Sequence, residues 1–207
     1  MISRQKSLVG SAAELVVIVG AAFGLAFAVQ AFIVKPYRIP SGSMEPTLTI
    51  GQRILVDRVG MSFSAPAIGD IYVFHPPANY TACADPNEGA SVAGSPHGQA
   101  CDVAQSRHAS VTFVKRVVGL PGDHLRIIDG EVIRNGRPER APYMIRCHGQ
   151  VTCNFPGTIV VPKGDYYMMG DNRPDSEDSR FWGPVPRSWL IGRVFFTYWP
   201  LNRIGGL

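Results

Sequence analysis

The sequence is poor in charged residues, which make up 17% of its 207 residues, whereas hydrophobic residues make up 45%. This composition excludes a disordered tail, because such segments combine low hydrophobicity with high charge. The net charge is only +4 and the basic residues are scattered, so we expect no nucleic acid partner. The length is sufficient for one anchored domain with a sizeable core, or at most for two small domains.

Cysteine is scarce as well, with four residues at positions 83, 101, 147 and 153. Three pairings are possible, and the short intervening loops favour Cys83–Cys101 and Cys147–Cys153. Disulfides indicate an oxidising compartment. The alternative is a zinc site, but CxxC and HxxxH spacings are absent, so we do not expect one from Cys83, His97, Cys101 and His108.

One long apolar run is present, LVVIVGAAFGLAFAVQAFIV over residues 15–34. About 20 residues at ~1.5 Å each span a hydrocarbon core of roughly 30 Å. Arg4 and Lys6 precede the run, and no acidic residue occurs among the first ten, which favours a cytoplasmic N-terminus. We therefore predict a short cytoplasmic segment over residues 1–14, a transmembrane anchor over 15–34 and an extracytoplasmic domain over 36–207.

A cleavable signal peptide is the alternative to a retained anchor. Ala26-Phe27-Ala28 has the small-x-small form of a cleavage site. The apolar run is longer than the usual hydrophobic region of a signal peptide, which favours retention.

The rest of the chain is rich in turn-forming residues, with 22 glycines and 17 prolines, and contains short β-branched runs such as RILVDRV, IYVF, VTFVKRVV and WLIGRVFF. These features predict a mainly β fold of short strands. Asp129-Gly130 and Asn135-Gly136 predict hairpin turns. Residues 77–110 predict an inserted surface loop, and residues 137–156 a second irregular segment that carries the other cysteine pair.

Two segments contain candidates for nucleophilic chemistry. In PSGSMEPTL, over residues 40–48, prolines and a glycine predict a rigid turn that holds a hydroxyl, although Ser/Gly/Pro turns are common. In FVKRVVGLPGD, strand alternation places Lys115 on the same side as Phe113 and Val117. Desolvation there lowers a lysine pKa, as a general base requires. Arg116 lies on the opposite side, where we expect its head to reach water.

A third segment, GDNRPDSEDSRFWG over residues 170–183, is rich in carboxylates. It fails the EF-hand pattern, because Arg173 and Ser176 stand where an Asp or Asn and a Gly are required. We expect neither a metal nor another cofactor. The segment instead predicts an ion pair between Asp178 and Arg180, with a serine free to support a neighbouring group.

In this order, PSGSMEPTL, GDIYVF, KRVVGLPGD and GDNRPDSEDSRFWG resemble segments of the bacterial signal peptidase I family. The resemblance extends from the anchor to the closing RIGG, except for residues 77–110 and about 137–156. It implies an antiparallel β-sheet domain and a serine endopeptidase of the bacterial inner membrane. Such an enzyme removes signal peptides from secreted and membrane precursors after Ala-x-Ala sites on the periplasmic, extracytoplasmic side.

The resemblance also implies roles for individual residues. Ser43 matches the nucleophile and Lys115 its general base, while the oxyanion hole uses the backbone N–H of Ser43 and the hydroxyl of Ser41. Ser176 matches the residue that orients the lysine, and Asp178 and Arg180 match the pair that braces the loop. The substrate-pocket positions correspond to Tyr37, Ile39, Met44, Leu48, Ile54, Phe113 and Val114.

The implied partners are signal peptides of preproteins and the lipid bilayer, with the translocation machinery as a further candidate. The apolar run FFTYWPL over residues 195–201 is a candidate for lipid contact. Three alternatives stay open: a catalytically silent, membrane-tethered binding protein of the same fold; a self-cleaving repressor-type protease, which the anchor and cysteines disfavour; and an enzyme that cuts its own anchor after Ala28.

Overall fold

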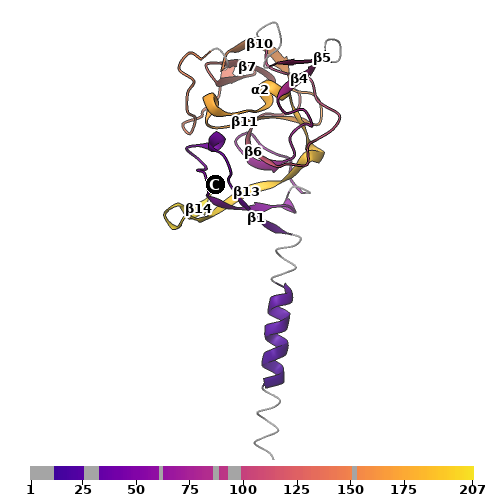
Figure 1. The fold of residues 1–207 in the computed structure, drawn as a ribbon, viewed down its shortest axis with the longest axis vertical. Helices are drawn as coiled ribbons and strands as arrows, with labels where there is room; N and C mark the ends of the chain where they lie inside the picture. The colour runs from indigo at the N-terminus through magenta and orange to yellow at the C-terminus, as the bar shows by residue number, and fades with distance from the viewer. Residues whose placement is uncertain (1–11, 26–32, 61–62, 86–88, 93–98, 151–152) are drawn as a thin grey trace, which may run out of the picture.

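The computed structural model describes residues 12–25, 33–60, 63–85, 89–92, 99–150 and 153–207. A helix over residues 12–25 extends away from a β-rich body (Figure 1). Within the described ranges, no helix has the length and apolar character needed to cross a bilayer. Part of the predicted anchor, residues 26–32 with Ala26-Phe27-Ala28, lies outside the described residues, as do Arg4 and Lys6.

The body is built on an antiparallel sheet of eight strands, in the order β1-β2-β13-β3-β6-β11-β12, with β14 paired to β13. Fully buried residues alternate with more exposed ones along β2, whereas all of β3 and β11 are buried, as in strands covered on both faces. The mainly β, antiparallel fold expected from the sequence is confirmed. The strands are β1 (Val34–Arg38), β2 (Arg53–Asp57), β3 (Ile71–Phe74), β6 (Phe113–Gly119), β11 (Asp165–Met169), β12 (Val185–Pro186), β13 (Leu190–Trp199) and β14 (Gly205–Gly206).

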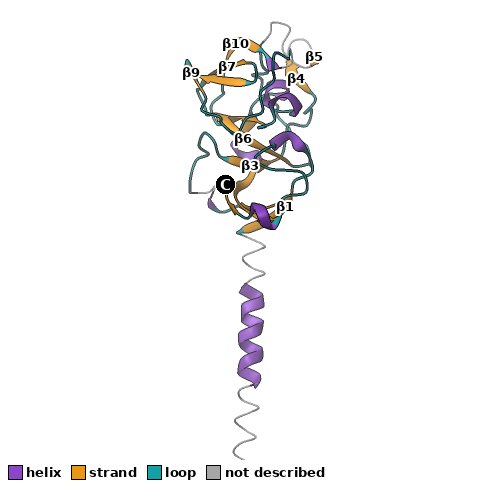
Figure 2. Cartoon of the chain, turned by 90° about the vertical axis from the view of Figure 1, so that its left-hand side faces the viewer, coloured by secondary structure: helices purple, strands orange, loops and turns teal. Residues whose placement is uncertain are grey.

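A second antiparallel sheet has the order β10-β7-β8-β9. Its strands are β7 (His124–Ile128), β8 (Glu131–Arg134), β9 (Arg137–Pro138) and β10 (Phe155–Val160). Asp129-Gly130 connects β7 to β8, and Asn135-Gly136 connects β8 to β9. Both residues of each pair have positive φ angles, 50° and 79° in the first pair and 52° and 78° in the second. This is the backbone of two-residue hairpin turns, so both predicted turns are confirmed. β7 and β10 lie at the end of the body away from the 12–25 helix (Figures 1 and 2).

The prediction that residues 77–110 form only an irregular surface loop is wrong in part. β4 (Ala82–Asp85) and β5 (Gly89–Val92) pair as a small antiparallel sheet. Runs of Ala and Ser contain too little apolar periodicity to predict these strands. The cysteines pair as Cys83–Cys101 and Cys147–Cys153, the pairings that the sequence favoured, and all four are buried.

The remaining elements are short helices near the ends of strands. They are η1 (Gly42–Met44), η4 (Arg173–Asp175), α2 (Ser179–Trp182), η5 (Arg187–Trp189) and η6 (Leu201–Arg203).

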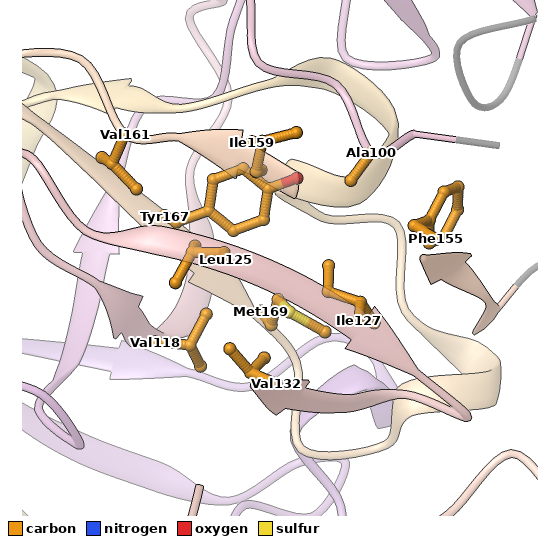
Figure 3. Packing of buried hydrophobic residues seen from close by; sticks show 10 residues of the cluster. All are labelled: Ala100, Val118, Leu125, Ile127, Val132, Phe155, Ile159, Val161, Tyr167 and Met169. Atoms are coloured by element: carbon orange, nitrogen blue, oxygen red, sulfur yellow. The ribbon is translucent and has the colours of Figure 1, made fainter. Parts of the chain in front are cut away.

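Three clusters of buried apolar side chains hold these layers together. One of them joins the second sheet to β11 and includes Leu125, Val132, Tyr167 and Met169 (Figure 3). A second packs around Trp182 of α2. The third lies beneath the segment that carries Ser43, and its members include Ile39, Met44, Leu48 and Ile54.

Candidate active site

Ser43 lies in the middle of the η1 turn. The turn closes with a hydrogen bond from Glu45 N to Gly42 O of 3.0 Å. Its neighbour Met44 is 1% exposed, and Leu48 is fully buried in the apolar cluster below. Because these side chains point into the core, the hydroxyl of Ser43 stays at the surface of the turn, facing a pocket.

The loop after β11 fastens this turn from the other side. Asn172 N donates to Ser43 O at 3.1 Å, and Asn172 Nδ2 donates to Gly42 O at 3.2 Å. Gly170 passes close by, and a Cβ there would collide with the backbone oxygen of Ser43 and with the side chain of Ser176. A glycine is therefore required where the two segments meet.

Lys115 reaches Ser43 from β6. Its Nζ donates a hydrogen bond to Ser43 Oγ at 2.6 Å, although the two residues lie 72 positions apart in the chain. The lysine is 4% exposed, and its Nζ lies 5.8 Å from the centre of the Phe113 ring. Among the described residues, no carboxylate forms an ion pair with it. The ammonium form therefore lacks a direct counter-ion.

Burial lowers the pKa of Lys115 from 10.5 to about 8. The value of about 8 is a net result: the charge of Arg180 lowers the pKa in the same direction as burial, while Asp178, Glu177 and Asp171 raise it. A lysine with this pKa is neutral in a large fraction of molecules near pH 8. It can then accept the proton of a serine hydroxyl, the requirement for an activated nucleophile without histidine.

Ser41 lies on the same turn as Ser43. The two hydroxyl oxygens are 3.5 Å apart, and the side chain of Ser41 is exposed at the pocket. A donor in this position can contact an oxyanion that forms next to Ser43 Oγ.

The acidic loop forms a closed network around Asp178, which is fully buried. Asp178 accepts hydrogen bonds from Arg180 Nε at 2.8 Å, Ser176 Oγ at 2.8 Å and Gly170 N at 3.1 Å. Burial alone would raise the pKa of Asp178, but the charge and hydrogen bonds of Arg180 hold it below its usual value. Ser176 lines the same pocket as Lys115, yet its hydroxyl donates to Asp178 rather than to the lysine.

Arg116 corrects one expectation. We expected its head to reach water, but the residue is 8% exposed. Its Nε and Nη2 bind both oxygens of the buried Asp171 at 2.8 and 2.6 Å, and its guanidinium stacks 3.8 Å from the Tyr143 ring centre. Thr47 Oγ1 also donates to Asp171 at 2.6 Å. Strand alternation predicts which side of the sheet Arg116 faces, but not which residues cover that side. The ion pair of Arg116 with Asp171 was therefore not predicted from the sequence.

The pocket has a volume of about 570 Å³. It brings together Ser41, Ser43, Lys115 and Ser176 with four predicted substrate-pocket residues, Ile39, Met44, Phe113 and Val114. The other three predicted pocket residues are not in its wall: Leu48 and Ile54 are fully buried, and Tyr37 packs against their cluster. Wall residues that we did not predict are Pro40, Gly42, Thr112, Pro174, Asp175, Glu177 and Phe181. In the sequence, only their position next to the predicted residues indicated that these residues could line the pocket.

Comparisons with known proteins agree over most of the chain. The family model described as "Signal peptidase, peptidase S26" matches residues 12–199. "Signal peptidase I" of Leptolyngbya laminosa is 34% identical over 190 residues, covering 91% of this chain and 80% of the relative. "Probable signal peptidase I-1" of a Synechocystis species is 37% identical, covering 88% and 80%. "Signal peptidase IB" of Staphylococcus aureus is 31% identical, covering 92% and 91%.

Among solved structures, a signal peptidase I from Enterococcus faecalis is 26% identical and aligns with a TM-score of 0.40. The alignment covers 63% of this chain and 97% of the other.

A serine lying against a buried lysine in an antiparallel β domain, together with the family model and the curated relatives, defines a serine peptidase, a hydrolase. The chain belongs to the signal peptidase I family, peptidase S26.

Proposed function

We propose that this protein is a membrane-tethered endopeptidase that cleaves signal peptides from secreted and membrane precursors after small-x-small sites, with Ser43 as nucleophile and Lys115 as general base. The observation that carries the proposal is the 2.6 Å contact between Lys115 Nζ and Ser43 Oγ in the pocket, where no carboxylate of the described residues forms an ion pair with the lysine. The names of the relatives support the substrate class.

The proposed reaction has two halves. Ser43 Oγ attacks the scissile carbonyl while its proton passes to the neutral Lys115, which then protonates the leaving amine. The acyl group stays on Ser43 as an ester. A water molecule attacks this ester, and Lys115 takes its proton and returns one to Ser43. The backbone N–H of Ser43 and the hydroxyl of Ser41 are the proposed donors to the oxyanion, each typically worth about 3–4 kcal/mol of barrier.

The pocket supports a preference for small side chains. Ile39, Met44 and Val114 are apolar residues of its lining, and Ile39 and Met44 are nearly fully buried. Closely packed side chains give way little to a larger group, which favours alanine at the residues that bind next to them.

Membrane attachment is the second part of the proposal. The apolar run over residues 15–34 would place the catalytic domain on the periplasmic side of the inner membrane. Trp199 and Leu201, 48% and 70% exposed at the end of β13 and in η6, are apolar groups of the FFTYWPL run that are available for lipid contact.

A peptide assay in detergent micelles tests the function. We expect the full chain to cut an Ala-x-Ala precursor peptide after the second alanine, as mapped by mass spectrometry. A peptide with phenylalanine in place of that alanine should be cut about 100-fold less efficiently, since pocket contacts discriminate on that scale. Absence of any cleavage would favour the catalytically silent binding protein. Equal cleavage of both peptides would reject the small-residue preference.

The activity should depend on pH through Lys115. Only the neutral amine accepts a proton, so kcat/KM should rise with pH around the lysine pKa of about 8 and fall roughly tenfold per unit below it. The measurement is kcat/KM for the peptide between pH 6 and 10. A flat profile from pH 6 to 9 would contradict the assignment of the base.

Glu177→Gln should move the midpoint of this pH profile to lower pH, because the Glu177 charge raises the pKa of Lys115. Glu131→Gln, on β8 outside this pocket, is the matched control.

A further inference from the structure

Both disulfides of the chain lie against one residue of the acidic loop, Arg180. From one side, Cys101 N donates to Arg180 O at 2.9 Å. From the other, Arg180 Nη1 lies 3.7 Å from Cys153 Sγ. Arg180 is 1% exposed, so these contacts are made inside the protein.

The Cys83–Cys101 side is anchored in the core. Cys101 is fully buried, its neighbour Ala100 is 2% exposed, and Ala100 belongs to the cluster drawn in Figure 3. In that view the Tyr167 hydroxyl points toward the Ala100 segment, and it donates to Cys101 O at 3.1 Å. A Cβ at Gly183 would lie 3.2 Å from Cys101 Sγ, so the disulfide also packs on the end of α2. The segment with Cys101 is thus a fixed support for Arg180.

The Cys147–Cys153 side is anchored to the second sheet. Gly130 N, in the turn between β7 and β8, donates to Cys153 O at 3.0 Å. A Cβ at Gly130 would lie 2.8 Å from Cys147 Sγ. This disulfide therefore ties Arg180 to a hairpin that contributes nothing to the wall of the active-site pocket.

Arg180 also makes hydrogen bonds to the loop that lies beside the catalytic groups. Its Nη2 donates to Ser176 O at 3.0 Å and to Arg173 O at 2.7 Å, and its Nε donates to Asp178 Oδ1 at 2.8 Å. Ser176 is part of the pocket wall beside Lys115, and Asp178 is the strongest charge acting on Lys115.

We propose that the two disulfides are positioning elements of the active site, which hold Arg180 between them and thereby keep Ser176 and Asp178 in place beside Lys115. This inference rests on the proposed function. A disulfide that only restricts the unfolded chain would change stability and nothing else. A positioning role also affects the solvation of Lys115, because a loosened loop admits water to the pocket and returns the lysine toward its ordinary pKa.

The test compares the full chain with Cys83→Ala/Cys101→Ala and with Cys147→Ala/Cys153→Ala, in the peptide assay across the pH range. Small displacements of catalytic groups cost up to about 100-fold, so we expect each pair of substitutions to lower kcat/KM by about 10- to 100-fold. We also expect the low-pH limb of the profile to move to higher pH. The charged groups that set this limb are Asp171, Glu177, Asp178 and Arg180, and none is changed in these variants.

Val132→Ala is the matched control. Val132 is fully buried in the cluster of Figure 3, and it makes no hydrogen bond to Cys101 or Cys153, the two cysteines that contact Arg180. It should lower the melting temperature but leave the pH limb in place. If the cysteine variants keep kcat/KM within about twofold and the same limb, or if Val132→Ala shifts the limb equally, the positioning role is overturned.

Should a cysteine variant fail to fold, Tyr167→Phe replaces it, since it keeps both disulfides and removes only the hydroxyl that holds Cys101 O. The loss expected from one hydrogen bond is about 2- to 10-fold in kcat/KM with the same shift of the limb, and no change would overturn the role. If the wild-type chain never cuts the peptide, the proposed function itself fails. If the wild type cuts and the variants match it, only the disulfide inference fails.

Discussion

Replacing Lys115 by methionine is expected to lower kcat/KM by at least about 1,000-fold while leaving the fold intact or more stable. The loss follows because a serine hydroxyl at its own pKa is a poor nucleophile once the adjacent base is gone. Stability should not fall, because methionine fills a similar volume and removes a buried amine whose charged form makes no ion pair with a carboxylate of the described residues. The measurements are peptide cleavage at pH 9 and urea unfolding of the same samples.

Lys115→Arg and Ser43→Ala complete this experiment. Arginine keeps the positive charge, but its pKa is too high for it to act as a base, so the enzyme should be equally inactive. Ser43→Ala removes the nucleophile and should match the lysine variants, because residues that act as one unit are not additive. Activity within tenfold of wild type in Lys115→Met would show that another group takes the proton.

Replacing Arg180 by methionine is expected to destabilise the protein by about 3–5 kcal/mol, the usual result of removing one partner from a buried ion pair. Asp178 would lose its counter-ion while still fully buried, and the carbonyls of Arg173 and Ser176 would lose a donor. Thermal unfolding followed by circular dichroism, together with urea titration, measures the effect.

Arg193→Met is the matched control for this prediction. Arg193 forms an ion pair with Asp70 at 3.3 Å, but its side chain is 51% exposed. Exposed pairs contribute about 0–1 kcal/mol, so the free energy of unfolding should hardly change. Similar losses in the two variants would mean that burial of the Asp178–Arg180 pair has no special importance.

Local chemistry explains which parts of the fold could be predicted from the sequence. Asp129-Gly130 and Asn135-Gly136 carry their turn type in two residues, because few other pairs adopt two positive φ angles. Alternation along β6 places Lys115 on the same side as Phe113, whose ring lies 5.8 Å from the lysine Nζ, although both sides of the strand are buried from Lys115 onward. Short loops likewise favoured the observed cysteine pairs.

Long-range packing explains what could not be predicted. Arg116 is buried because Asp171 and Tyr143, far away in the chain, cover its side of the sheet. Leu48 and Ile54 are as apolar as the pocket residues, and only the folded structure places them below the pocket rather than in its wall. β4 and β5 pair without a periodic apolar pattern, and the disulfide on β4 joins it to Cys101, beyond β5.

The alternation of β6 has a consequence for how the chain can vary in length. Lys115 and Arg116 are adjacent basic residues on opposite faces of the sheet, one against a hydroxyl and the other against a carboxylate. Inserting or deleting a single residue ahead of them within β6 would exchange the two faces. A permanently charged guanidinium would then point at Ser43, and the amine would be neutralised by Asp171 instead. Insertions and deletions should therefore be confined to connections such as residues 77–110 and be absent between Phe113 and Lys115.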